Sequence, residues 1–533
     1  MLRNPLLLLF FLIATGLRAQ PTATSKYWIV FRDKATSPGE STPSPALSPN
    51  ALASRRSRGL AVDETDRPLS SAYLTRLRRL GIVPECPSRW LNAVSAQLSP
   101  AQQAAVSQLP FVREIIPLDP HIIITSVATP AKRASNAVNQ STTSNLAQPQ
   151  LAPVLSQIQA DAFARAGLTG RFVSVGVIDA GFFAADSASA LRHIFVREGI
   201  RAVRDYVNPQ KTQNNLFRTL ETMSDTHGTE VLAAIAGLDP TNNVQYGLAT
   251  DATFYLARTD QGNREFRGEE DNWVAAMEWM DSLGVRLINT SLGCTKGMTN
   301  PADNYQPSQM DGHTSLISRA AQMAVEKKGI LLIVSAGNEG DDRNWRIIST
   351  PADASGVLAI GATNSRLWNR IGYSSIGPEE LPYLKPNVSC YSLYGTSLSA
   401  PVITGFAACL MQANPKLTNR ELMSVIEQSS HLYPYGNNFV GYGVPQASRA
   451  LALLRKQTPP PTSRTIQAVG KTITLPVAST EPQVSVFRKK DATHVMHQEA
   501  LKATGNKLVI RRLAGEKQTT VDLKKEVIEV VWE

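Results

Sequence analysis

Four short stretches of this sequence carry side chains that together could activate a serine hydroxyl. Asp179 ends an apolar run, His227 stands in Thr-His-Gly-Thr, Asn338 in Ala-Gly-Asn-Glu-Gly, and Ser397 in Gly-Thr-Ser-Leu-Ser-Ala-Pro. A serine is a weak nucleophile until a base takes its proton, and a neutral histidine suits that task near pH 7. An aspartate can orient the imidazole, while an asparagine amide and a backbone N–H can bind an oxyanion. The set predicts acyl transfer through Ser397.

Each residue alone also has a simpler structural interpretation. Ser397 precedes an apolar stretch that reads as a buried helix, so it could be only a helix N-cap. Asp179 could likewise be a cap, His227 a structural residue at a helix start, and Asn338 a turn residue. All four nevertheless fall at expected strand or helix ends, in the order Asp, His, Asn, Ser. That combination favours a catalytic constellation over four separate coincidences.

The elements around these residues alternate between strands and helices. The run 171–179 is almost continuously apolar, as buried strands of parallel sheets are, and similar runs recur at 252–257, 285–290, 330–336 and 357–361. Helical stretches separate them at 229–236, 272–283 and 316–328. This pattern predicts an α/β domain with a mostly parallel sheet covered by helices on both faces. Catalytic groups of such folds gather at the carboxyl ends of the strands.

The 533 residues are too many for one compact core, and the sequence divides into six parts. Residues 1–19 read as a secretory signal peptide, and residues 20–125 as a small α+β domain. A Ser/Thr/Asn-rich linker, 126–150, is the kind of segment that proteases cut. The α/β domain occupies 151–455, a Pro-rich linker 456–464, and a small β domain 465–533.

Composition excludes several function classes. The formal charge of +10 is spread over the whole chain without dense Lys/Arg runs, so nucleic-acid binding is not expected. No apolar stretch is long enough for an integral membrane segment. Four cysteines are few for a secreted protein, so we expect buried thiols with one optional disulfide. His494 and His497 lack further ligands and are interpreted as surface residues rather than a metal site.

With these motifs in view, the region of about 150–455 resembles the subtilisin-like serine proteases, or subtilases. The stretches around Asp179, His227, Asn338 and Ser397 are similar to that family's catalytic and oxyanion motifs. The resemblance implies a three-layer subtilisin-like domain and identifies Asp179, His227, Ser397 and Asn338 as catalytic. It also implies a substrate-binding set: Ser291, Leu292, Gly293, Ala336 and Gly337.

Two further resemblances concern the group of subtilases to which the chain is similar and the way in which the chain matures. The segments 270–273 and 351–354 resemble secreted subtilases of the Bacteroidetes. Residues 26–120 are similar to the family's inhibitory propeptide, which implies an intramolecular partner that is removed by self-cleavage in the linker. The expected product is a secreted, periplasmic or cell-surface endopeptidase that acts on polypeptides.

Several departures from the family pattern keep alternatives open. The connection between residues 388 and 395 is much shorter than in most subtilases, so the wall near Ser397 is expected to be more open. One alternative is therefore an inactive binding or adhesive protein on the same scaffold, and another is a transpeptidase. No cofactor is required for the chemistry. Structural Ca²⁺ lacks a clear ligand motif, because the acidic clusters 269–271 and 341–342 are interpreted as solvated faces.

Overall fold

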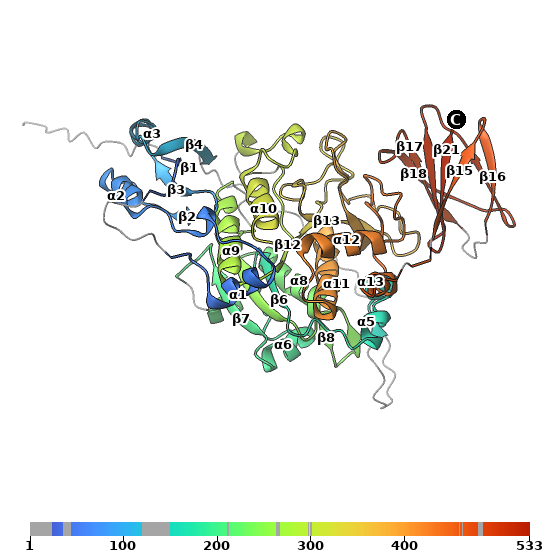
Figure 1. Cartoon of the computed structure of the whole chain (residues 1–533), viewed down its shortest axis with the longest axis horizontal. Helices are drawn as coiled ribbons and strands as arrows, with labels where there is room; N and C mark the ends of the chain where they lie inside the picture. The colour runs from blue at the N-terminus through green and yellow to red at the C-terminus, as the bar shows by residue number, and fades with distance from the viewer. Residues whose placement is uncertain are drawn as a thin grey trace, which may run out of the picture.

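The computed structural model describes residues 24–35, 44–119, 150–210, 213–262, 267–296, 298, 301–457, 459–460, 462–477 and 483–533. Three units follow one another along its length: a small N-terminal unit, a large central unit and a C-terminal β unit (Figure 1). The predicted signal peptide, 1–19, and the predicted linker up to residue 149 lie outside the described residues.

The N-terminal unit is a four-stranded antiparallel sheet with helices. The strand order is β2-β3-β1-β4, with β1 (Ser25–Phe31) pairing with both β3 (Ala93–Leu98) and β4 (Val112–Asp119). Strand β2 spans Cys86–Ser88, and the helices are α1 (Pro49–Ser57), α2 (Ser71–Arg79) and α3 (Pro100–Ser107). Helix α3 begins with the capping box Ser99/Gln102.

The central unit contains a seven-stranded, wholly parallel sheet in the order β14-β13-β12-β11-β6-β10-β7. Five strands match the predicted runs: β6 (Ser174–Asp179), β10 (Thr253–Arg258), β11 (Leu287–Thr290), β12 (Leu331–Ser335) and β13 (Leu358–Thr363). Sequence reasoning missed the two edge strands, β7 (Ile200–Asp205) and β14 (Val388–Tyr391). Strand β7 carries charged residues and is only half-buried, and β14 is short, so neither shows the long apolar run of an inner strand.

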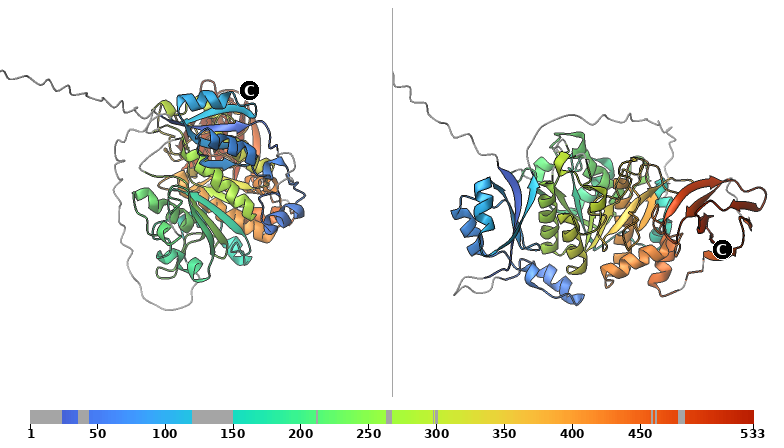
Figure 2. Two further views of the ribbon diagram at one scale, coloured as in Figure 1. Left: turned by 90° about the vertical axis from the view of Figure 1, so that its left-hand side faces the viewer. Right: turned by 90° about the horizontal axis from the view of Figure 1, so that it is seen from above.

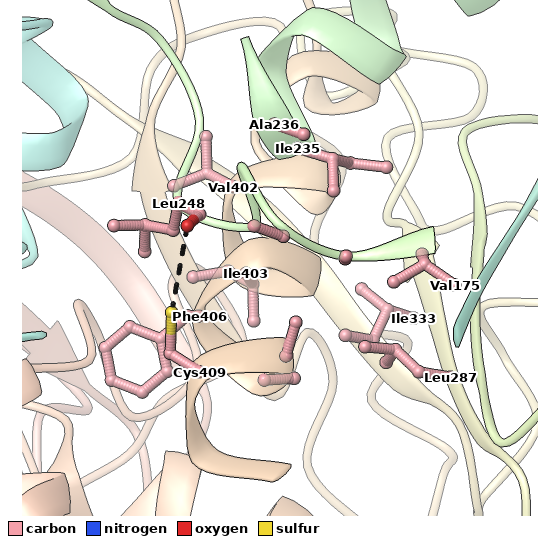
Figure 3. Packing of buried hydrophobic residues seen from close by; sticks show 14 of the residues in the cluster. Val175, Ile235, Ala236, Leu248, Leu287, Ile333, Val402, Ile403, Phe406 and Cys409 are labelled. Carbon is pink, nitrogen blue, oxygen red and sulfur yellow. Dashed lines mark hydrogen bonds between the residues drawn. The ribbon is translucent and has the colours of Figure 1, made fainter. Parts of the chain in front are cut away.

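Helices cover both faces of this sheet and create two hydrophobic cores. Helices α8 (His227–Ala236) and α11 (Ala400–Ala413) pack on one face, and α9 (Glu269–Leu283) and α10 (Leu316–Glu326) on the other. Alternate strand residues point to opposite faces: Leu287 joins the first core and Ile288 the second. Figure 3 shows part of the first core, where the Cys409 thiol approaches the Leu248 carbonyl. The predicted three-layer α/β fold is confirmed.

Within the described residues, one helical stretch has the length and hydropathy of a membrane span. It runs over Thr396–Ala413, and 78% of it is buried inside the protein. A core helix of a folded domain meets the same criteria. The four cysteines are free thiols, and Cys390 and Cys409 are buried in the first core.

The C-terminal unit is a β structure that shares a core with the central unit. Its larger sheet has the order β15-β21-β20-β17-β18, with β15 (Ser463–Ala468), β17 (Val484–Lys489), β18 (Val495–Leu501), β20 (Gln518–Asp522) and β21 (Val527–Trp532). Strands β16 (Thr472–Pro476) and β19 (Lys507–Arg511) form a second sheet. Phe487 and Val527 pack against Leu432 and Phe439 of the central unit. His431 Nε2 also lies 3.1 Å from Asp522 Oδ2. The C-terminal unit is therefore packed against the central unit and is not joined to it by the linker alone.

The N-terminal unit lies against the central unit (Figure 2). Buried ion pairs join it to helix α9. Lys26 Nζ lies 2.6 Å from Asp271 Oδ2, and Ser95 Oγ donates to the same oxygen at 2.7 Å. Glu278 accepts from the Trp90 N–H at 3.1 Å. The prediction that 269–271 form a solvated face is therefore wrong. All three residues are buried: the N-terminal unit covers Asp271, while Gln261 and Tyr305 of the central unit contact Glu269 and Glu270.

An inserted segment between β1 and α2 extends this interface. Arg55, on α1, is 2% exposed and bridges Asp66 Oδ2 at 2.6 Å and Asp281 Oδ1 at 2.7 Å. Asp66 also binds the buried Lys328 Nζ at 2.7 Å. The segment therefore attaches to the central unit through a continuous buried ion network.

Replacing Arg55 by alanine should loosen this attachment strongly. Removing one partner of a buried ion pair leaves an uncompensated charge, which costs about 3–5 kcal/mol. We expect Arg55→Ala to lower the free energy of unfolding by this amount in urea titrations of chains that also carry Ser397→Ala, in which self-cleavage cannot remove the N-terminal unit. The neighbouring Arg56 is exposed, so Arg56→Ala should change it by less than about 0.5 kcal/mol. Equal effects of the two variants would contradict the importance of the buried network.

Candidate active site

The predicted catalytic residues lie at one edge of the parallel sheet. Asp179 is the last residue of β6, Ser291 follows β11, and Asn338 comes shortly after β12. The carboxyl ends of parallel strands meet at the same edge, where ligands of such sheets bind. His227 reaches this edge as the first residue of α8, and Ser397 lies in the turn before α11. The sheet therefore gathers side chains that are up to 218 residues apart in the sequence.

Asp179 and His227 form a hydrogen-bonded pair. His227 Nδ1 lies 2.7 Å from Asp179 Oδ1, which also accepts from the Ala180 N–H at 2.8 Å. Asp179 is fully buried, and its Oδ2 accepts no hydrogen bond within the described part of the chain. Such a carboxylate fixes the orientation of the ring and leaves Nε2 free to act as a base.

The glycine after His227 is required by close packing. The Gly228 N–H donates to the Gly181 carbonyl at 2.9 Å, and a Cβ on Gly228 would lie only 2.4 Å from that oxygen. Any larger residue would push α8 away from the turn after β6. The glycine after His227 therefore allows α8 to lie close enough to β6 for His227 to bond to Asp179.

The charge on His227 is set by opposing effects. Burial of the ring is the largest single effect and lowers the pKa of His227, but the charge and hydrogen bond of Asp179 act with other nearby carboxylates, and the net effect raises the pKa above its ordinary value of 6.5. Glu230 and Asp260 raise the pKa further. The imidazolium is therefore stabilised, as is required of a group that takes a proton during a reaction.

Ser397 lies in a one-turn helix, Thr396–Leu398, just before α11. The predicted buried helix is present, but it begins at Ala400, so Ser397 stands in the turn that leads into it rather than at its first residue. Ser291 Oγ donates to the Ser397 carbonyl at 2.9 Å. This contact ties the serine turn to the end of β11.

The side chains of Asn338 and Ser397 lie close to each other, beside Gly395. The Thr396 N–H donates to Asn338 Oδ1 at 2.9 Å, which leaves the amide Nδ2 as the free donor of that side chain. A Cβ on Gly395 would lie 3.1 Å from Ser397 Oγ and 3.5 Å from Asn338 Nδ2. The hydroxyl and the amide are therefore close enough to contact one substrate carbonyl.

These groups line a cleft of about 530 Å³. His227, Ser397 and Asn338 line it, together with four of the five predicted substrate-binding residues: Ser291, Leu292, Gly293 and Gly337. Ala336 does not line the cleft. Its side chain is fully buried in the second core, because Ser335 and Ala336 point to opposite sides of the chain as it leaves β12.

Sequence reasoning missed several residues of the cleft, in particular Glu230, Asp260, Glu339 and Ser349. Two of them had a signal in the sequence. Asp260 comes just after the carboxyl end of β10, a position like that of Asp179 at the end of β6. Glu230 lies one helical turn after His227, on the same side of α8. Ser349 had none, because its segment has neither helical nor strand periodicity.

The short connection after β14 leaves its large side chains in solvent. Leu393 is 52% exposed and Tyr394 is 77% exposed, and neither is among the described residues that line the cleft. Of the described residues, no group of three or more His, Cys, Asp or Glu side chains is arranged to hold a metal ion.

Comparison with known proteins gives two family matches. The family model described as "Subtilase family" matches residues 170–443, and that described as "Peptidase S8 propeptide domain, Bacteroidota" matches residues 26–137. The first match covers more than half of the 533 residues.

Individual relatives agree with the first match. Subtilisin DY of Bacillus licheniformis is 28% identical over 285 residues, which cover 51% of this chain and 89% of the relative. Subtilisin NAT of Bacillus subtilis subsp. natto is 29% identical over 300 residues, covering 54% and 67%. A crystal structure of MycP1 without its N-terminal propeptide covers 56% of this chain and 96% of that chain, with 23% identity and a TM-score of 0.41. This chain belongs to the subtilase family and carries a Bacteroidota-type Peptidase S8 propeptide domain before its peptidase domain.

Proposed function

We propose that this chain is a secreted serine endopeptidase that hydrolyses peptide bonds through an acyl-enzyme on Ser397. The observation that carries the proposal is the meeting of the Asp179–His227 pair with Ser397 and Asn338 in one cleft. Membership of the subtilase family supports it. Every step uses a side chain or backbone group of the chain itself.

The reaction proceeds in two balanced halves. His227 takes the proton of Ser397 Oγ as this oxygen bonds to the peptide carbonyl carbon. The Asn338 amide and the Ser397 N–H bind the resulting oxyanion, and His227 gives its proton to the leaving amine as the C–N bond breaks. A water molecule then repeats the sequence on the ester, which releases the acid and restores the Ser397 hydroxyl.

The N-terminal unit acts in this proposal as an intramolecular inhibitor that self-cleavage removes. Its match to a propeptide family and its buried contacts with α9 support that role. Secretion is supported by the leader-like sequence of residues 1–19, in which Arg3 precedes the apolar run 6–13.

Covalent labelling tests the proposal. The purified full-length chain is treated with a fluorophosphonate and analysed by mass spectrometry beside Ser397→Ala. We expect a label on Ser397 of the wild type only, with loss of more than about 100 N-terminal residues. If no label appears, trypsin is added to remove an uncleaved N-terminal unit and the reaction is repeated. Absence of labelling after that step would contradict the proposal and favour a non-catalytic binding protein.

The pH dependence of hydrolysis should follow the protonation of His227. Only the neutral imidazole can take the serine proton, so activity is lost as the pH falls through the pKa of His227. Because Asp179 raises this pKa, the acidic limb of kcat/KM should have its midpoint above 6.5. Measurement of kcat/KM between pH 5 and pH 9 checks this, and a midpoint well below 6.5 would contradict it.

A further inference from the structure

We propose that the C-terminal β unit positions Asn338 for catalysis, with Gln498 of β18 as the positioning residue. The link between them is the segment 370–377 of the central unit, called the bridge below. The inference rests on the proposed peptidase function and adds a role for the C-terminal unit. None of the described residues that line the cleft belongs to this unit, so its effect has to pass through the bridge.

The C-terminal unit holds the first residue of the bridge through two hydrogen bonds. The Arg370 N–H donates to Gln498 Oε1 at 3.2 Å, and Gln498 Nε2 donates to the Arg370 carbonyl at 2.8 Å. A glutamine amide carries both an acceptor and a donor, so one side chain satisfies both backbone groups of Arg370. Figure 1 shows β17 and β18 on the side of the C-terminal unit that faces the central unit.

The last residues of the bridge are held by the same unit. Ile376 belongs to one apolar cluster with Phe487 and Val495 of the C-terminal unit. The Gly377 N–H donates to the Asn438 carbonyl at 2.8 Å, and Asn438 Oδ1 in turn accepts from the Val495 N–H at 2.9 Å. Both ends of the bridge therefore have their positions set by contacts that include the C-terminal unit.

The middle of the bridge is bonded to the backbone on both sides of Asn338. The Ser375 N–H donates to the Gly337 carbonyl at 3.1 Å. Ser375 Oγ accepts from the Glu339 N–H, also at 3.1 Å. Because Gly337 and Glu339 directly precede and follow Asn338, the position of the bridge sets the position of the Asn338 backbone.

The contact between the two segments is too close for either to move alone. A Cβ on Gly340 would lie only 2.0 Å from the Ser374 carbonyl oxygen, and a Cβ on Gly337 would lie 2.9 Å from Ser375 Oγ. Close-packed protein groups transmit displacement to their neighbours. A shift of the bridge should therefore shift Asn338 as well.

Arg370 stiffens the bridge between its ends. Its Nη1 donates to the carbonyls of Gly372 and Ser374, at 2.6 Å each. Its Cζ lies 5.0 Å from the centroid of the Phe439 ring, and Phe439 is in the same apolar cluster as Phe487. A displacement of Arg370 is thus carried directly to Ser374.

The bridge also contacts the chain that leads into the serine turn. The Tyr373 hydroxyl donates to the Ser392 carbonyl at 2.9 Å, and Ser392 Oγ donates to the Gly395 carbonyl at 2.6 Å. The Tyr373 carbonyl accepts from the Gly340 N–H at 2.7 Å. Tyr373 therefore connects the loop after β12 with the segment before Ser397.

Oxyanion binding depends steeply on position, which makes this connection consequential. A donor stabilises the oxyanion only at hydrogen-bond distance from it, and a displacement of about 1 Å can lower the rate by about a hundredfold. The oxyanion is present only in the transition state and the intermediates that resemble it. A displaced Asn338 should therefore lower kcat and leave KM nearly unchanged.

Kinetics of Gln498→Ala test the proposal. The N-terminal unit is removed from the variant and from the wild type, and the active fraction of each is counted by fluorophosphonate labelling to completion. One peptide amide substrate then gives kcat and KM separately. We expect kcat to fall by about tenfold and KM to change by less than about twofold, since the lost bonds act on the oxyanion donor.

Two further variants of β18 make the test specific. Gln498→Glu keeps the size of the side chain and the acceptor for the Arg370 N–H, but it places an oxygen against the Arg370 carbonyl, so kcat should fall as in Gln498→Ala. This variant also keeps the test open should the alanine variant not fold. The matched control is His497→Ala, because His497 is exposed and successive strand residues point to opposite faces. Its kcat should equal that of the wild type.

A double-mutant cycle separates positioning of Asn338 from a general loss of structure. Asn338→Ala by itself should lower kcat by about 10²–10³, as loss of an oxyanion donor does. If Gln498 acts through Asn338, Gln498→Ala should lower kcat by less than about twofold further in the Asn338→Ala background. A purely structural effect would lower kcat by the same factor in both backgrounds.

The outcomes distinguish this inference from the proposed function. An unchanged kcat in Gln498→Ala and Gln498→Glu, a loss expressed in KM alone, or equal losses with and without Asn338 would overturn the positioning role and leave the peptidase function standing. A wild type that is neither labelled nor hydrolyses peptides would overturn the peptidase function, and the positioning role with it.

Discussion

Ser397→Ala should abolish peptide hydrolysis and leave the chain at full length. The hydroxyl is the nucleophile of the proposed reaction, and loss of the serine in this arrangement lowers kcat by on the order of 10⁶, as in subtilisin. Because self-cleavage uses the same groups, the N-terminal unit should stay covalently attached. Mass spectrometry of the purified protein and a fluorogenic peptide assay measure the two effects.

The controls for Ser397→Ala separate chemistry from folding. Ser187 is exposed and donates to the Ala184 carbonyl, so Ser187→Ala should process and hydrolyse as the wild type does. The Ser397→Ala chain should also keep the wild-type circular dichroism spectrum. A Ser397→Ala protein that still processes itself would show that another group is the nucleophile.

Asp179→Asn should lower kcat by about 10⁴, the loss known for this change in serine peptidases. An asparagine Oδ1 could still accept from the Ala180 N–H and from His227 Nδ1, so the geometry is compatible with the change. The asparagine amide would leave the imidazole in the wrong tautomer and would lack the negative charge that stabilises the imidazolium as it forms. The residual activity should therefore report on the protonation of His227 more than on its position.

The pH profile of Asp179→Asn provides a second readout. Without the Asp179 charge, burial lowers the pKa of His227 with less opposition, so the acidic limb of the residual activity should move to lower pH. Asp186→Asn is the control, because Asp186 pairs with Arg218 and is not among the described residues that line the cleft. An unchanged limb in Asp179→Asn would contradict the assignment of the limb to His227.

The sequence predicted the inner strands well because burial on both faces leaves a plain apolar signature. It missed β7 and β14 because an edge strand needs no such signature: Arg201, Arg204 and Asp205 interrupt the apolar residues of β7, and polar residues flank the short β14, Val388–Tyr391. The buried acidic residues 269–271 were misread for a related reason. Their charges looked solvated, but Lys26 and Ser95 from a distant part of the chain cover Asp271.

Some features of the candidate site could likewise be predicted from the sequence, and others could not. Asp179, His227, Asn338 and Ser397 could be found from the sequence because chemistry demands particular side chains, and the glycines beside them are demanded by close backbone contacts such as Gly228 with Gly181. Ala336 shows the limit of that reasoning: it belongs to a motif, yet its side chain points into the core.

The sequence by itself determined the family, the order of the candidate catalytic groups and the α/β character, because these depend on residue types and on local periodicity. Only the tertiary structure decided which groups share the cleft with Ser397. Glu339 and Ser349 come together there because β12 ends beside β11 and the Ser349 N–H returns to the Ala336 carbonyl at 3.0 Å. Such contacts join residues from separate turns of the chain, and no local pattern encodes them. The same holds for Arg55, whose partner Asp281 is 226 residues away.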